Sequence, residues 1–126
     1  MELSDLDILI VDDHEAMRAL LTRVFTKVGV MKLRTTGSAE AALAVLRERP
    51  ATLIIADKNL PGMDGLAFIA AVRNESAFGS PKIIVLSGDA SKAHAEAARV
   101  AAADMVLVKP VPPSALLAAI NELFAV

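Results

Sequence analysis

Short apolar runs alternate along the chain with longer segments in which apolar residues recur at helical spacing. The first compact run is Ile8–Val11, and Lys32–Thr36 is a weaker strand candidate further on. Between them the apolar residues fall on one helical stripe, listed in chain order as Met17, Leu20, Leu21, Val24, Phe25 and Val28. Gly29 then provides a helix stop. This part of the chain is therefore predicted to form a strand, a helix and a strand.

The same alternation continues to the end of the chain. Three further apolar runs predict strands: Leu53–Ala56, Ile83–Leu86 and Met105–Val108. Ile83–Leu86 is expected to be buried on both faces. The predicted helices between and after them are the segment from Ser38, an N-cap, to Pro50; the segment after Asp64 with Leu66, Ile69 and Val72; Ser91–Ala103; and the segment opened by Pro112-Pro113 with Leu116, Ile120, Leu123 and Phe124. Strand and helix thus alternate five times.

This alternation is typical of an α/β fold in which a parallel sheet is covered on both faces by right-handed crossovers. No linker, repeat or low-complexity tract interrupts the pattern. Residues 1–126 are therefore expected to form a single domain.

Composition and charge narrow the possible functions. Hydrophobic residues make up 55% of the chain, which is ample for a core, and the net charge is −2 with no clustered basic face for nucleic acid. Without cysteine there is no disulfide or thiolate metal site. The N-terminus lacks a signal-peptide pattern, and no apolar run approaches the ~20 residues that span a bilayer. We expect a cytoplasmic protein with no membrane or direct nucleic-acid partner.

Polar residues stand where the predicted strands end. Asp12 and Asp13 follow the first strand, Asp57 the third, Ser87 the fourth and Lys109 the fifth. The carboxyl ends of parallel strands share one edge of the sheet, and ligands bind there at the point where the winding reverses. With the strands ordered 2-1-3-4-5, the reversal falls between the first and third strands, and the three aspartates converge.

Three carboxylates held together repel one another unless a cation lies between them. A hard divalent ion such as Mg²⁺, which binds oxygen ligands and shares phosphate oxygens, resolves that repulsion. Lys109 offers an ammonium for an anion, and Ser87 offers a hydroxyl donor. Carboxylate nucleophile, metal, ammonium and hydroxyl together favour phosphoryl transfer onto an aspartate.

These motifs resemble the receiver domains of two-component response regulators, the CheY-like family. They are the Val11-Asp12-Asp13 strand end, Asp57 within the stretch Ile55–Gly65, Ser87, and Lys109-Pro110, and they span nearly the whole chain. The resemblance implies the flavodoxin-like (βα)5 receiver fold, a doubly wound five-stranded parallel sheet with strand order 2-1-3-4-5, the order of CheY itself.

The resemblance also implies a role for each site residue. Asp57 would be the phosphoacceptor, Ser87 the hydroxyl of the switch and Lys109 the phosphate partner, with a cis bond before Pro110. The Mg²⁺ ligands would be Asp13 and Asp57 directly, Asp12 largely through water, and Asn59 through its backbone carbonyl. Two positions depart from the family: Val106 stands where Tyr or Phe is usual, and the turn Ala101–Asp104 lacks the glycine often found there.

The function implied is a phosphorelay switch. A sensor histidine kinase or a histidine phosphotransfer protein would phosphorylate Asp57, and the changed surface of the fourth helix, fifth strand and fifth helix would alter binding to a protein target or a second copy. We expect Leu117 and the alanines of the fourth helix to contribute to this surface.

Other interpretations stay open at this point. The chain ends directly after the last helix and begins with Met1, so it is either a stand-alone receiver or a fragment of a longer response regulator or hybrid kinase. An aspartyl-nucleophile phosphatase would need Asp-x-Asp after the first strand, and an FMN module is disfavoured by the absence of Tyr and Trp.

Several charged residues are expected to have ordinary roles. Asp64 should cap the third helix. His14 and His94 have no second metal ligand at a suitable spacing and should be exposed helix residues. Four basic residues are expected on solvated faces: Arg47, Arg49, Arg73 and Lys82.

Overall fold

The computed structural model describes residues 2–126, with the backbone alone at His94. Its five strands form one parallel sheet in the order β2-β1-β3-β4-β5, as predicted. The strands are β1 (Asp7–Val11), β2 (Lys32–Thr36), β3 (Leu53–Asp57), β4 (Lys82–Ser87) and β5 (Met105–Val108). The α-helices are α1 (Glu15–Lys27), α2 (Ala39–Glu48), α3 (Gly65–Asn74), α4 (Lys92–Val100) and α5 (Pro113–Phe124), with 3-10 turns at Leu3–Asp5 and Ser76–Phe78.

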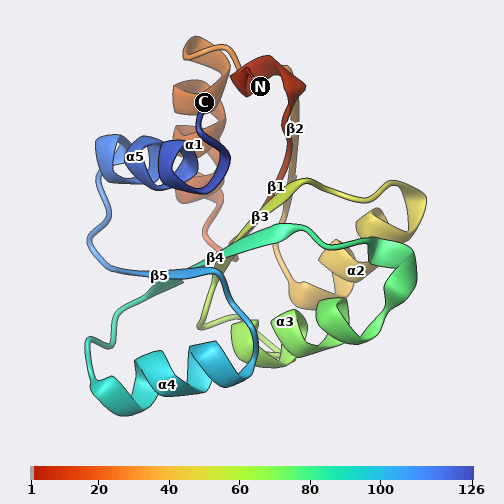
Figure 1. Cartoon of the computed structure of the whole chain (residues 1–126), viewed down its shortest axis with the longest axis vertical. Helices are drawn as coiled ribbons and strands as arrows, with labels where there is room; N and C mark the ends of the chain where they lie inside the picture. The colour runs from red at the N-terminus through yellow and green to blue at the C-terminus, as the bar shows by residue number, and fades with distance from the viewer. Residues whose placement is uncertain (1) are drawn as a thin grey trace.

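The helices cover both faces of the sheet (Figure 1). Helices α1 and α5 lie on one face, and α2, α3 and α4 lie on the other. Along β1, Ile8 and Ile10 belong to the core beneath α1 and α5, whereas Leu9 and Val11 belong to the opposite core. This alternation follows from the two-residue period of a strand, and it explains why β1 and β3 are apolar almost throughout.

Two predicted helix starts are confirmed by their capping bonds. The Ser38 hydroxyl accepts a hydrogen bond from the backbone N–H of Ala41 at 3.1 Å. The Asp64 carboxylate likewise accepts from the N–H of Ala67 at 2.8 Å, so Asp64 does cap α3. Each cap satisfies one of the N–H groups that the first helical turn leaves without a partner.

The predicted extent of α4 was too long at its end. The helix stops at Val100 because the chain turns there in a Schellman motif, in which the N–H of Ala103 donates to the carbonyl of Ala98 and that of Ala102 to Arg99. Ala102 has φ of 70°, in the left-handed region. The turn thus keeps the geometry that glycine usually supplies, with alanine in its place.

The apolar stripe of α1 is only partly buried. Leu21 and Phe25 are buried against the sheet, as predicted, but Met17, Leu20 and Val28 are each between 36% and 39% exposed. The sheet therefore buries only part of the predicted stripe. Within the described chain, no helix is long and apolar enough to cross a membrane.

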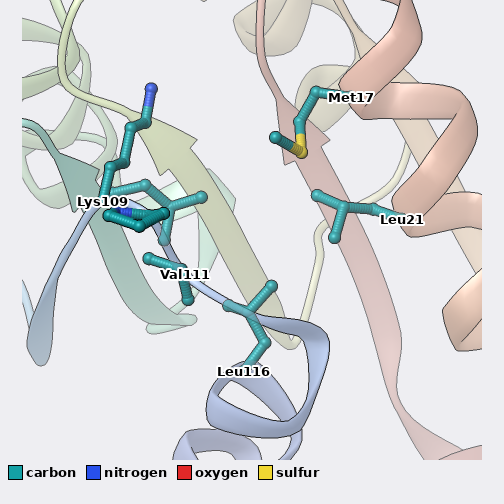
Figure 2. Close-up of a pocket in the computed structure, with 7 residues that line it drawn as sticks. Met17, Leu21, Lys109, Val111 and Leu116 are labelled. Atoms are coloured by element: carbon teal, nitrogen blue, oxygen red, sulfur yellow. The ribbon is translucent and has the colours of Figure 1, made fainter.

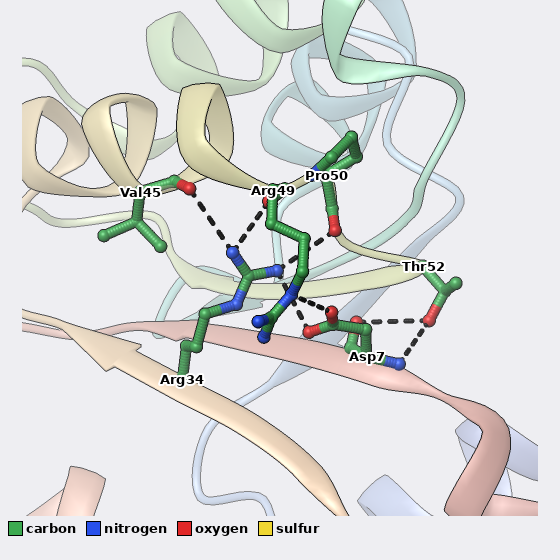
Figure 3. Close-up of polar contacts among 6 residues, drawn as sticks. All are labelled: Asp7, Arg34, Val45, Arg49, Pro50 and Thr52. Carbon is green, nitrogen blue, oxygen red and sulfur yellow. Dashed lines mark hydrogen bonds and ion pairs between the residues drawn. The ribbon is translucent and has the colours of Figure 1, made fainter.

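An ion-pair cluster ties the start of β1 to the end of α2 (Figure 3). Asp7, the first residue of β1, lies 3.0 Å from Nη2 of Arg34 and 2.7 Å from Nε of Arg49. Arg34 also donates to the carbonyls of Val45, Arg49 and Pro50, where the positive charge meets the carbonyl end of the helix. The prediction that Arg49 is only a solvated residue was therefore wrong, although its side chain remains half exposed.

A second ion-pair cluster lies before β5. Arg73 donates to Asp104 at 2.9 Å and to the carbonyls of Pro81 and Ala102, and the N–H of Ile83 donates to Asp104. Lys82 lies at the edge of the same cluster, 4.0 Å from Asp104. Arg73 was thus wrongly predicted to face only solvent. Long-range partners of this kind cannot be read from a single sequence segment.

Candidate phosphoacceptor and metal site

The predicted site residues meet at the carboxyl edge of the sheet. Asp57 ends β3 and Ser87 ends β4, while Asp12 follows β1 and Lys109 follows β5. The strand register places Val11 beside Ala56, Asp57 beside Leu86 and Ser87 beside Val108. The topology of a parallel sheet with β1 next to β3 therefore brings together side chains that are far apart in sequence.

Three aspartates and a histidine form a compact group of potential metal ligands. One ligand atom from each of Asp12, Asp13, His14 and Asp57 lies within 4.8 Å of all the others. Asp12 and Asp57 are buried, with 2% and 1% of their surface exposed, whereas Asp13 and His14 face solvent. The group is thus covered by protein at Asp12 and Asp57 and accessible to solvent at Asp13 and His14.

The spacing of these atoms suits a divalent cation. An octahedral ion with bonds of about 2.1 Å separates its ligand atoms by about 3.0 Å when adjacent and about 4.2 Å when opposite. The four ligand atoms lie within 4.8 Å of one another, which exceeds the larger value by about 0.6 Å, a difference that side-chain rotation can close. An acidic group of this kind, rich in carboxylate oxygens, is typical of the Mg²⁺ site of receiver domains.

Both oxygens of the Asp57 carboxylate are held by donors. Nζ of Lys109 lies 2.6 Å from Oδ2, and the backbone N–H of Asn59 donates to Oδ1 at 3.0 Å. Asp57 thus keeps a fixed orientation, and its charge is compensated within a buried setting. Lys109 is itself anchored, since its N–H donates to the carbonyl of Ser87 at 2.7 Å, and the Lys109–Pro110 bond is cis, as the resemblance implied.

Ser87 reaches the predicted edge of the site and is fully buried there. Its hydroxyl accepts the N–H of Asp89 at 3.0 Å and donates to the carbonyl of the same residue at 3.4 Å. The hydroxyl is therefore directed toward the connection between β4 and α4. Any change in its hydrogen bonding would act on that connection directly.

His14 and Arg18 belong to the site although their roles were not predicted. Nδ1 of His14 lies 3.0 Å from the Asp12 carboxylate and 3.2 Å from the Asp13 carboxylate, so the prediction that it lacks neighbouring ligands was wrong. Its predicted exposure is confirmed, with 67% of the side chain accessible, but it precedes α1 as the N-cap rather than lying within the helix. Arg18 donates to the carbonyl of Asp12 at 2.6 Å. The only sequence signal for His14 was its position directly after two aspartates.

The loop after β3 is held close to the end of that strand. The N–H of Gly65 donates to the carbonyl of Lys58 at 2.8 Å, and a Cβ at this position would lie 2.7 Å from Cα of Lys58. Only glycine allows so close an approach of two backbones. Glu40 supports the same loop from α2 by accepting the N–H of Met63 at 3.1 Å. Hydrogen bonds from its own backbone N–H and from that of Met63 lower the pKa of Glu40.

An apolar pocket of about 460 Å³ adjoins the site. Figure 2 shows Met17 and Leu21 of α1 on one side, with Val111 and Leu116 on the other and Lys109 at the rim. The full lining is Met17, Leu21, Leu86, Lys109, Pro110, Val111 and Leu116. A hydrophobic surface therefore begins directly beside the lysine that holds Asp57.

Comparison with known proteins shows the family of this chain. Residues 8–121 match the model of the response regulator receiver domain family. The chain is 33% identical over 117 residues to "Probable chemotaxis protein CheY" of Rhizobium etli, covering 93% of this chain and 91% of that protein. It is 35% identical to the sensory/regulatory protein RpfC of Xanthomonas campestris, over 91% of this chain but only 16% of RpfC. The structure of the chemotaxis response regulator CheY4 of Vibrio cholerae superposes with a TM-score of 0.88 at 28% identity, over 94% of this chain and 98% of that one.

This chain belongs to the response regulator receiver domain family and has its CheY-like, flavodoxin-like fold. Receiver domains are signalling phosphoacceptors of two-component systems rather than catalytic enzymes, and their partners are histidine kinases. The alternatives of an aspartyl phosphatase and an FMN module are set aside by this family assignment.

Proposed function

We propose that this domain accepts a phosphoryl group on Asp57, in the presence of Mg²⁺, from a phosphohistidine on a sensor histidine kinase or a histidine phosphotransfer protein. One observation carries the proposal: a buried carboxylate, held by Lys109 and Asn59, lies within the acidic group formed with Asp12 and Asp13.

The chemistry follows from these contacts. An oxygen of Asp57 attacks phosphorus, the phosphorus–nitrogen bond of the donor breaks, and the donor imidazole leaves as an acyl phosphate forms. Lys109, now 2.6 Å from Asp57, can pair instead with a phosphoryl oxygen. Asp12, Asp13, Asp57 and the carbonyl of Asn59 would hold Mg²⁺, which neutralises charge between carboxylate and phosphoryl oxygens when bound.

Intact-mass measurement tests the nucleophile. Incubation with a phosphohistidine donor or acetyl phosphate should add one phosphoryl group to the chain when Mg²⁺ is present, and Asp57→Asn should abolish the adduct. Asp13→Ala should weaken Mg²⁺ binding because it removes a charged oxygen ligand from a site that has few. An undiminished adduct on Asp57→Asn would overturn the assignment.

The donor protein is expected to contact the apolar pocket beside Lys109. A donor must bring its phosphorus within bonding distance of Asp57, and the pocket lined by Met17 and Leu21 opens next to that position. Met17 is also 36% exposed, so its side chain is accessible to a partner. Met17→Glu should slow transfer from a donor protein and leave phosphorylation by acetyl phosphate unchanged.

Phosphorylation is proposed to alter the surface formed by α4, β5 and α5. Val100 and Val108 are 81% and 45% exposed, and Ala93 and Ala97 are also exposed. Two residues that were expected to contribute to this surface are not fully exposed. Ala98 is buried, and Leu117 is partly buried against the core beneath α1 and α5. Val100 is therefore the better anchor for a docking target or a second copy of the chain.

A pair of substitutions separates this surface from the core. Val100→Glu should abolish phosphorylation-dependent association, followed by light scattering or pull-down, with phosphorylation intact. Leu117→Glu should lower stability because the side chain contacts the core. Association that survives Val100→Glu would remove this surface from the proposal.

The signal is proposed to leave the site without an aromatic switch. Val106 is β-branched, has few χ1 choices and lies beside Val85 in the sheet. We expect Ser87 to move toward the phosphoryl group and the β4–α4 connection to follow, with Val106 keeping its rotamer. Structures with and without beryllofluoride decide this, and a large rearrangement of Val106 with an unmoved connection would contradict it.

The domain is proposed to work either alone or as the receiver of a longer regulator. The first arrangement is supported by the match to nearly all of the Rhizobium etli protein, and the second by the match to a small part of RpfC. Reading the gene beyond Val126 distinguishes them.

A further inference from the structure

His14 adds a nitrogen donor to a site that is otherwise made of oxygen atoms. Its Nδ1 lies 3.0 Å from one oxygen of Asp12 and 3.2 Å from one oxygen of Asp13, and the three atoms share a 4.8 Å group with Asp57. The ring is thus directed toward the place where the carboxylates converge.

The need to cap α1 does not explain this orientation. His14 is the N-cap residue of α1, yet its side chain makes no capping hydrogen bond to the helix. The turn at Asp12 is already closed by the Asp12 side chain, because Oδ1 of Asp12 accepts the backbone N–H of His14 at 2.8 Å. The ring contacts to both carboxylates are additional to these local bonds.

The distances match those between ligands of a single metal ion. Bonds of about 2.1 Å from one ion to nitrogen and oxygen place adjacent ligand atoms about 3.0–3.4 Å apart, in octahedral or tetrahedral geometry. The separations of Nδ1 from the two carboxylates are 3.0 and 3.2 Å. A cation can therefore bind Nδ1 and the carboxylates together with little rearrangement.

We propose that His14 is a ligand in this site, through Nδ1, for a borderline divalent cation such as Ni²⁺, Zn²⁺ or Co²⁺. Such ions favour imidazole, whereas Mg²⁺ favours oxygen and gains little from a nitrogen. The inference rests on the proposed metal site at Asp12, Asp13 and Asp57, and adds that this chain's pocket selects among metals through His14.

The proton balance of this binding is simple. A neutral imidazole needs to lose no proton in order to bind the ion through Nδ1, because its proton can reside on Nε2. The ring is 67% exposed, so exchange of that proton through water is open. The carboxylates then exchange their contact with Nδ1 for binding to the cation.

Calorimetric titration of the untagged chain tests the proposal. Ni²⁺ and Mg²⁺ are titrated separately into the wild type, His14→Gln and the matched control His94→Gln, which removes the other histidine of the chain. We expect His14→Gln to weaken Ni²⁺ binding by roughly tenfold or more, while its Mg²⁺ affinity stays within about twofold. His94→Gln should change neither affinity.

Spectroscopy gives a second readout. Because the chain has no Cys, any change in the visible absorption of Co²⁺ on binding reports nitrogen and oxygen ligands alone. In protein labelled at histidine, Co²⁺ should shift or broaden the imidazole signals of His14, and Mg²⁺ in excess should reverse the effect because both ions compete for one site.

Two outcomes would overturn the proposal. Equal Ni²⁺ affinity of the wild type and His14→Gln would show that the ring only hydrogen-bonds the carboxylates. Loss of Ni²⁺ binding in His94→Gln would place the nitrogen ligand elsewhere. Failure of the proposed function is separable, since that would appear as absent Mg²⁺-dependent phosphorylation of the wild type.

Discussion

Replacing Ala102 with glycine is expected to stabilise the domain, although Ala→Gly substitutions usually destabilise. Ala102 occupies the left-handed position of the Schellman motif after α4, with φ of 70°. An L-residue in this region costs about 1–2 kcal/mol because Cβ crowds the following carbonyl, and glycine is free of that cost. Nε of Arg73 donates to the backbone carbonyl of Ala102 at 3.1 Å, and glycine keeps that carbonyl, so this bond is retained.

The opposing term is the greater freedom of glycine in the unfolded chain. It lowers stability by about 0.4–1 kcal/mol, and the two terms together leave a net gain of about 0.5–1 kcal/mol. For a domain of this size the gain corresponds to a rise in Tm of about 2–5 °C. Ala97→Gly is the matched control. Ala97 is exposed within α4, where Ala→Gly should cost up to ~1 kcal/mol.

Urea unfolding, followed by the helix signal in circular dichroism, measures the midpoint and slope of both variants. Ala102→Gly should move the midpoint upward and Ala97→Gly downward, with equal slopes. If both substitutions lowered the midpoint by similar amounts, the strain assigned to Ala102 would be refuted.

Three further predictions concern the site and its supports. Without Mg²⁺, Lys109→Met should destabilise the chain by about 3 kcal/mol, because the Asp57 carboxylate is then buried without the Lys109 ammonium. In the Asp57→Asn background the same substitution should cost much less. A double-mutant cycle of urea unfolding measures the difference. Gly65→Ala should cost about 2–3 kcal/mol and weaken Mg²⁺ binding, both measurable by calorimetry, because its Cβ meets backbone that cannot yield. The lowered pKa of Glu40 means that its ionised form stabilises the loop fully above the unfolded-state pKa, and that this contribution is lost as pH falls through the lower folded pKa. Protection of the Met63 amide from hydrogen exchange should therefore fade on acidification, and Glu40→Gln should remove that pH dependence.

The fold and the position of the site could be predicted because both depend on local patterns. Each buried strand is a continuous apolar run, and Asp57, Ser87 and Lys109 stand where those runs stop. Once the strands are known to be parallel, topology alone brings these ends together. The resemblance to receiver domains then supplied the strand order and the expected roles.

Features that depend on long-range or side-chain geometry could not be predicted. Asp7 meets Arg34 and Arg49 across 27 and 42 residues of sequence, which no pattern in one segment reveals. The orientation of the His14 ring depends on a rotamer that spacing does not specify. The end of α4 was placed too late because alanine favours helix, and the left-handed conformation of Ala102 is imposed by the turn.

The ion-pair clusters lie at the opposite edge of the sheet from Asp57, and this has a mechanical consequence. Asp104 lies just before β5 and contacts Lys82 and the N–H of Ile83, at the beginning of β4. At the carboxyl ends of the same two strands, the N–H of Lys109 donates to the carbonyl of Ser87, and Nζ of Lys109 contacts Asp57. The amino ends of β4 and β5 are therefore held in place by the contacts of Asp104. When Lys109 exchanges one partner for another, displacement should grow along the strand toward its carboxyl end, where the β4–α4 and β5–α5 connections carry it outward.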